Sequence, residues 1–119
     1  MRVMIVGASS NPRKYGNKAV RAYLRAGHEV IPVNPHEDVV EGVATWADVR
    51  EPPGPIDRAT FYVPSGVGFE VMRRLAERRD VGEVWLNPGA ESPELIEEGR
   101  RLGLNVIVGC SIIDIGEVP

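Results

Sequence analysis

The first sixteen residues constrain the fold of this 119-residue chain more than any other stretch. Residues 2–6 are a short apolar run rich in β-branched side chains, which is typical of a strand buried on both faces. A loop of small residues and turn formers follows, and after Gly16 the apolar residues recur at helical spacing. A strand, a tight loop and a helix N-terminus form a common phosphate-binding corner, because free backbone N–H groups meet the positive end of the helix dipole there.

The loop at residues 7–16 carries part of a phosphate-binding signature. The G-x-G-x-x-G spacing of dinucleotide-binding folds is absent, since the small positions are Gly7, Ala8, Ser9 and then Gly16. Residues 12–27 contain five cations and no acid, although the whole chain has a formal net charge of −3. A solvated helix face with a sign bias is the alternative, but positive charge concentrated at this corner favours a phosphate site.

The remaining composition predicts one α/β domain over residues 1–119, because this length allows a single core and no second substrate domain. The single cysteine, Cys110, excludes a disulfide framework and a thiolate zinc cluster. No apolar run is long enough to cross a membrane, and the mildly acidic balance argues against a nucleic-acid partner. Since Met1 leads at once into a strand, we expect a cytoplasmic protein without a leader, a membrane contact or nucleic acid.

Further apolar runs at residues 30–33, 56–63, 83–86 and 104–108 alternate with segments of helical periodicity. This alternation predicts a doubly wound, Rossmann-like α/β domain with a five-stranded parallel sheet. Residues 42–46 are expected as a short edge strand, which gives the order 3-2-1-4-5. Small or proline-containing loops follow the strands at residues 7–12, 34–35, 64–68 and 87–89. They are expected to share the carboxyl edge of the sheet, where such folds bind ligands.

The end of the second strand discriminates between nucleotide ligands. NAD-binding units usually carry an acid there for the ribose hydroxyls, whereas this chain has Asn34-Pro35-His36. The sequence therefore argues against an NAD(P)-binding redox enzyme or sensor, which stays open as an alternative. Pro35 offers a flat apolar wall suited to an adenine ring, and it equally serves to end a strand.

Motifs spread in order over nearly the whole chain resemble those of the small stand-alone CoA-binding proteins. The domain of that family is similar to the CoA-binding domains of the succinyl-CoA synthetase α subunit and of ADP-forming acyl-CoA synthetases. The matching segments are Val6-Gly7-Ala8-Ser9 with Asn11-Pro12, Gly27-His28-Glu29-Val30 with Pro32-Val33-Asn34-Pro35, Tyr62-Val63-Pro64, Leu86-Asn87-Pro88-Gly89, and Cys110.

This resemblance implies that coenzyme A or an acyl-CoA binds at the carboxyl edge, with its phosphates on the loop at residues 7–16 and on the N-terminus of the first helix. The implied phosphate contacts are Gly7, Ala8, Ser9, Arg13, Lys14 and Tyr15; Asn34 and Pro35 flank the adenosine, Val63 and Pro64 line its other side, and Asn87, Pro88 and Gly89 lie further along. Relatives often carry a lysine for the 3′-phosphate where this chain has His36, and an imidazole is mostly neutral at pH 7.

The residues show no catalytic constellation and no metal-ligand spacing, which favours non-catalytic CoA binding over an enzyme. Cys110 is the one candidate nucleophile, and it could contact the thiol of a bound CoA. Alternatively, Cys110 is only a small buried side chain at the end of a strand. The chain can also be the CoA-site subunit of a split acyl-CoA synthetase, because it lacks the second domain with the phosphorylated histidine. A homodimer and a synthetase subunit therefore both stay open as partners.

Overall fold

A computed structural model describes all 119 residues. Its centre is a parallel sheet of five strands in the order β2-β1-β5-β6-β7. The strands are β1 (Arg2–Val6), β2 (Glu29–Val33), β5 (Ile56–Phe61), β6 (Val81–Leu86) and β7 (Val106–Val108). The predicted α/β class with a Rossmann-like parallel sheet of five strands is confirmed.

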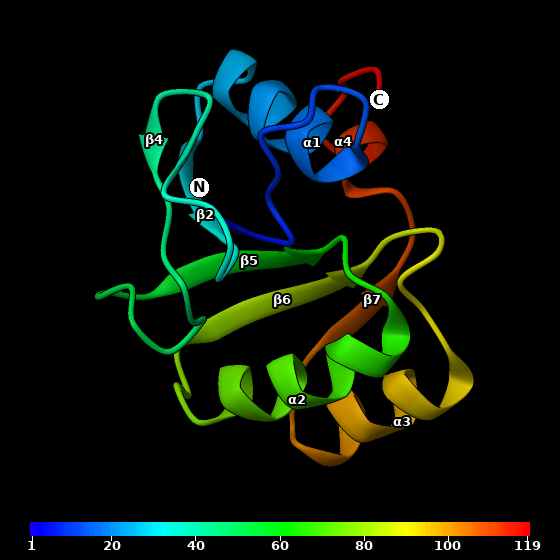
Figure 1. Cartoon of the computed structure of the whole chain (residues 1–119). Coiled ribbons are helices and arrows are strands. Elements are labelled where there is room, and N and C mark those ends of the chain that lie inside the picture. The colour runs from blue at the N-terminus through cyan, green and yellow to red at the C-terminus, as the bar shows by residue number, and fades with distance from the viewer.

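Helices cover both faces of the sheet (Figure 1). The helices α1 (Tyr15–Arg25) and α4 (Ser111–Asp114) lie on one face, and α2 (Ser65–Ala76) and α3 (Pro93–Arg101) lie on the other. This arrangement confirms the doubly wound prediction, since α1 covers one face of the sheet, whereas α2 and α3 both cover the other. No helix of the chain is both long enough and apolar enough to cross a membrane.

The structure differs from the expectation at one edge of the sheet. Residues 42–46 were expected as the strand beside β2, but they contribute only one parallel bridge, between Val33 and Trp46. Just before this bridge, β3 (Val39–Val40) and β4 (Val43–Ala44) form a small antiparallel hairpin. Its turn at Glu41 and Gly42, both with positive φ, reverses the chain and leaves too few residues for a sheet strand. Counted along the chain, the sheet strands therefore have the order 2-1-3-4-5.

Alternation along β1 divides the core into two layers. Met4 and Val6 pack toward α2 and α3, whereas Val3 and Ile5 pack toward α1 together with Tyr23. These β1 side chains are at most 2% exposed. Because successive side chains of a strand point to opposite faces, a strand covered on both faces must be apolar throughout. This burial fixes the position of β1, and with it the loop that follows.

Candidate functional site

The loops after β1, β2, β5 and β6 meet at the carboxyl edge of the sheet, as expected, and enclose a cavity of about 520 Å³, which we call the first cavity. These loops come from four separate parts of the chain, so that only the parallel topology brings them together. The first cavity is lined by Gly7, Ser9, Lys14, Tyr15, Gly16, Asn34, Tyr62, Val63, Pro64, Pro88, Gly89 and Ala90.

Two glycines allow the loop at residues 7–16 to fold closely on itself. Gly7 has a φ of +88°, and a Cβ atom there would lie 2.7 Å from the carbonyl oxygen of Tyr62. A Cβ atom on Gly16 would lie 2.0 Å from the carbonyl oxygen of Gly7. The start of α1 therefore sits directly against the end of β1, at a separation that only glycine permits.

The N-terminus of α1 has hydrogen-bond donors without partners. Lys14 is the N-cap residue, but its side chain makes no capping hydrogen bond, and the first turn of the helix contains no acid. The backbone N–H groups of Ser9, Tyr15 and Gly16 donate no hydrogen bond within the chain. Free N–H groups at a helix N-terminus, beside an exposed lysine, form an arrangement that binds anions.

A buried amide group holds this loop in place from below. Asn17 is fully buried, and its Nδ2 donates to the Ser9 carbonyl oxygen at 2.9 Å. Its Oδ1 accepts from Nε of Arg21 at 2.7 Å, and Arg21 also donates to the Pro12 carbonyl oxygen at 3.0 Å. Arg21 therefore stabilises the loop, whereas Lys14 forms no ion pair. Asn17 was not among the predicted site residues.

A second cavity of about 450 Å³ lies beside the first, on the other side of Gly7. The two cavities share a wall made of Gly7, Asn34, Val63 and Pro64. Asn34 joins the two loops, because its Nδ2 donates to the Ala8 carbonyl oxygen at 2.8 Å and its Oδ1 accepts from the His36 N–H at 2.8 Å. The other lining residues of the second cavity are Val6, Val33, Pro35, His36, Ala47, Asp48, Val49, Val67, Glu70, Val71 and Arg74.

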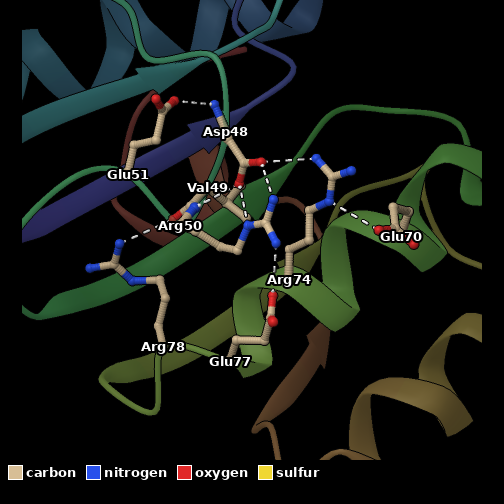
Figure 2. Close-up of polar contacts among 8 residues, drawn as sticks. All are labelled: Asp48, Val49, Arg50, Glu51, Glu70, Arg74, Glu77 and Arg78. Atoms are coloured by element: carbon tan, nitrogen blue, oxygen red, sulfur yellow. Dashed lines mark hydrogen bonds and ion pairs between the residues drawn. The ribbon is translucent and has the colours of Figure 1, made fainter.

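The polar wall of the second cavity belongs to a network of acids and arginines (Figure 2). The carboxylate of Asp48 accepts from Nη2 of Arg50 at 2.8 Å and from Nη1 of Arg74 at 2.9 Å. Nε of Arg74 also donates to Glu70 at 3.0 Å. The hydrogen bonds and charge of Arg50 are the main reason that the pKa of Asp48 lies below its ordinary value.

Beneath the first cavity, a chain of buried polar side chains connects β5, β6 and α4. Nδ2 of Asn87 donates to Thr60 Oγ1 at 2.6 Å, and Oδ1 of Asn87 accepts from the Ser111 N–H at 2.9 Å. Tyr62 lines the cavity, and its hydroxyl lies 3.2 Å from Ser111 Oγ. Burial raises the pKa of Tyr62 to about 12, so the phenol stays neutral at ordinary pH. Cys110 is partly buried next to this chain.

The predicted site residues divide into three groups by position. Those that line the first cavity are Gly7, Ser9, Lys14, Tyr15, Asn34, Val63, Pro64, Pro88 and Gly89, and Pro35 lines the second. Ala8, Arg13, Asn87 and Cys110 line neither cavity. Tyr62 and Ala90 line the first cavity although sequence reasoning did not assign them to the site. No His, Cys, Asp and Glu side chains of the chain form a group of three suited to a metal ion.

Comparisons with known proteins agree on one family. A family model described as a CoA binding domain matches residues 1–115. The α subunit of acetate–CoA ligase (ADP-forming) II from Pyrococcus furiosus is 30% identical over 115 residues, which cover 88% of this chain and 25% of that subunit. The chain thus spans about a quarter of this relative. The uncharacterized protein YneT of Bacillus subtilis is 30% identical over 115 residues, which cover 93% of this chain and 82% of YneT.

Solved structures show the same fold. A conserved hypothetical protein from Pyrococcus furiosus superposes with a TM-score of 0.85 at 36% identity, covering 95% of this chain and 97% of its own. The dinucleotide-forming acetyl-coenzyme A synthetase 1 of Ca. Korarchaeum cryptofilum, solved in complex with phosphate and ADP, has a TM-score of 0.77 at 27% identity. That match covers 89% of this chain and 25% of the synthetase.

Proposed function

This chain belongs to the CoA binding domain family, and we propose that it binds coenzyme A or an acyl-CoA at the carboxyl edge of its sheet without catalysing a reaction. The observation that carries the proposal is the uncapped N-terminus of α1. There the N–H groups of Ser9, Tyr15 and Gly16 have no partner and lie beside the free cation of Lys14. A pyrophosphate provides the negative charge and the acceptors that these donors lack.

The two cavities differ in chemistry as the two parts of an adenosine diphosphate do. The first cavity holds the free N–H groups and Lys14, which suit the pyrophosphate. The second has a wall of Pro35, Val49 and Val71, which suits a flat, largely apolar base. We therefore place the adenosine in the second cavity, the pyrophosphate in the first, and the pantetheine arm toward Pro88 and Gly89.

The position of Glu37 argues for CoA over NAD(P). It is the first acid after β2, and a carboxylate that binds ribose hydroxyls usually stands at the end of that strand. Both of its oxygens bond Ser10 instead, one to the backbone N–H and one to the hydroxyl at 3.1 Å. These bonds lower the pKa of Glu37, with the backbone bond as the main cause. The carboxylate therefore holds the loop at residues 7–16 and is not free for a ribose.

The synthetase relatives give a second candidate function. Because the chain matches only a quarter of the acetate–CoA ligase α subunit, it can supply a CoA site to separately encoded synthetase domains. In that case a partner subunit co-purifies from the native source, whereas a stand-alone CoA-binding protein is isolated without one.

Calorimetric titration with CoA, dephospho-CoA and NAD⁺ tests the proposal. We expect CoA to bind and NAD⁺ to give no heat. The Lys14→Gln variant should bind CoA roughly tenfold more weakly, since a hydrogen bond to a charged group contributes about 1.5–3 kcal/mol. Lys18→Gln is the matched control, because Lys18 lies one turn further along α1, over the Tyr15 ring, and does not line the first cavity. If both variants lose the same CoA affinity, Lys14 acts through long-range electrostatic attraction and not through a direct contact. Binding of NAD⁺ alone would refute the proposal.

A further inference from the structure

Val49 lines the second cavity and has a backbone N–H group without a partner in the chain. Val49 is 3% exposed, and its N–H group donates no hydrogen bond within the chain. Its carbonyl oxygen, by contrast, accepts from Nη1 of Arg78 at 3.1 Å (Figure 2). Buried N–H groups are nearly always paired, because an unpaired one costs about 1–3 kcal/mol. An acceptor on a ligand in this cavity would satisfy the Val49 N–H.

The residue before Val49 provides a hydrogen-bond acceptor. The carboxylate of the preceding residue, Asp48, lines the same cavity, and its side chain is 19% exposed. Its Oδ1 accepts from the backbone N–H of Arg50 at 2.9 Å and from Nε of Arg50 at 3.1 Å. Oδ2 accepts from Arg50 and from Arg74. Asp48 remains ionised in this setting, so it can only accept hydrogen bonds.

The segment that carries both groups is rigid. Arg78 donates to the carbonyl oxygens of Val49, Pro52 and Gly54, at 3.1, 2.6 and 2.7 Å, and its side chain is only 6% exposed. The Asp48 N–H donates to Glu51 at 2.8 Å, on the side away from Arg74 (Figure 2). The Asp48 carboxylate and the Val49 N–H are therefore held at a fixed spacing, and preorganised polar groups of this kind select a ligand with little loss of entropy.

We propose that Asp48 and Val49 select adenine as the base of the bound nucleotide. The Val49 N–H donates to a ring nitrogen, and the Asp48 carboxylate accepts from the neighbouring exocyclic amino group. This assignment rests on the proposed function, which places the adenosine in the second cavity. Adenine presents an amino donor next to a ring-nitrogen acceptor, whereas hypoxanthine and guanine present an oxygen acceptor in place of that amino group. Their oxygen would face the carboxylate, and the pairing would fail.

Arg74 is the group that the amino group displaces from Asp48. Its side chain is 39% exposed, and it contributes one of the two hydrogen bonds to Oδ2. On leaving Asp48, Arg74 keeps its bond to Glu70, which is carried by the same helix one turn earlier. Arg50 keeps its bonds to Asp48 throughout. The exchange therefore leaves no carboxylate in the cavity without a cation.

The first test compares CoA with analogues in which only the base is changed, titrated into the unmodified protein. The hypoxanthine analogue should bind roughly tenfold more weakly than CoA. One of the 1-deaza and 7-deaza analogues should lose affinity and the other should not, which identifies the ring nitrogen that accepts from Val49. Hypoxanthine and adenine analogues of equal affinity overturn the inference while CoA binding stands. If CoA itself does not bind, the proposed function fails as well.

The second test uses the ratio of the CoA affinity to that of the hypoxanthine analogue, measured within one variant. In Asp48→Ala this ratio should fall below tenfold, even where the loop loosens and both affinities drop. It should fall to near one where N7 accepts from Val49, and only part of the way where N1 does, because N1 of hypoxanthine carries a hydrogen that still opposes the Val49 N–H. Glu77→Ala is the matched control, since Glu77 pairs with the other side of Arg50 at 3.3 Å and lines neither cavity. It should keep the tenfold ratio. An Asp48→Ala variant that also keeps the ratio contradicts the role of the carboxylate.

Discussion

Replacing Gly16 by alanine tests the construction of the phosphate corner. The new Cβ atom would lie 2.0 Å from the Gly7 carbonyl oxygen, whereas ordinary van der Waals contact begins at 3.4 Å. The start of α1 and the end of β1 must therefore separate by more than about 1 Å. That shift also moves the free N–H groups of Ser9, Tyr15 and Gly16, on which the proposed phosphate contact depends.

The matched control is Gly66→Ala. Gly66 is the second residue of α2, as Gly16 is of α1, but a Cβ atom there meets nothing within 4 Å. Overpacking costs typically about 1–3 kcal/mol, and alanine is up to about 1 kcal/mol more favourable than glycine within a helix. Gly66→Ala should therefore be neutral or stabilising. Because both variants gain the same helix propensity, the free energy of unfolding of Gly16→Ala should lie about 1–3 kcal/mol below that of Gly66→Ala.

Urea unfolding and CoA titration of both variants measure these effects. We expect Gly16→Ala to lower the urea midpoint and to weaken CoA binding by at least about tenfold, since hydrogen bonds to a charged group contribute about 1.5–3 kcal/mol each. Gly66→Ala should bind CoA as the unmodified protein does. Equal stability and equal affinity of the two variants would refute the close contact between α1 and the end of β1.

Two further predictions concern the polar chain beneath the cavity. Asn87→Ala should lower the free energy of unfolding by about 2–4 kcal/mol, because it removes a hydrogen-bond partner from Thr60, the Ser111 N–H and the Phe61 carbonyl oxygen. Asn105→Ala, at an exposed position, is the control. Equal urea midpoints of the two variants would contradict the role of Asn87. Tyr62 loses its proton near pH 10 when unfolded and near pH 12 when folded, so its contribution to stability is complete below pH 10 and is lost as the pH rises toward 12. This loss amounts to about 2–3 kcal/mol of the free energy of unfolding. Urea unfolding between pH 10 and pH 12 should show the loss in the unmodified protein and not in Tyr62→Phe. The same pH profile in both proteins would contradict the raised pKa.

The backbone architecture could be predicted because it depends on local patterns. Continuous apolar runs marked β1 and β2 as strands buried on both faces. The parallel order then brought their loops to one edge, which is how Gly7, Asn34 and Pro64 came to line a common cavity. Residues 42–46 were misjudged because a short apolar run fits an edge strand and a hairpin equally well, and the turn at Glu41 and Gly42 decided between them.

The roles of single polar side chains could not be predicted, because their partners lie far away in the sequence. Asn87 was expected at the ligand, yet it is 3% exposed and bonds Ser111, 24 residues later. Arg58 stands in an apolar strand run, and the structure shows it 6% exposed between Glu83 and Asp114, with its guanidinium over the Trp85 ring. Only the folded packing shows which polar groups remain free for a ligand.

The central claim is that CoA binds on the loop at residues 7–16 and the N-terminus of α1. Titration of the isotope-labelled protein with CoA, followed by the amide signals in NMR spectra, tests this claim most directly. We expect the largest shifts at the unpartnered N–H groups of Ser9, Tyr15 and Gly16, with the signals of α3 (Pro93–Arg101) unchanged. Saturable binding that moves the α3 signals and leaves those three amides in place would contradict it.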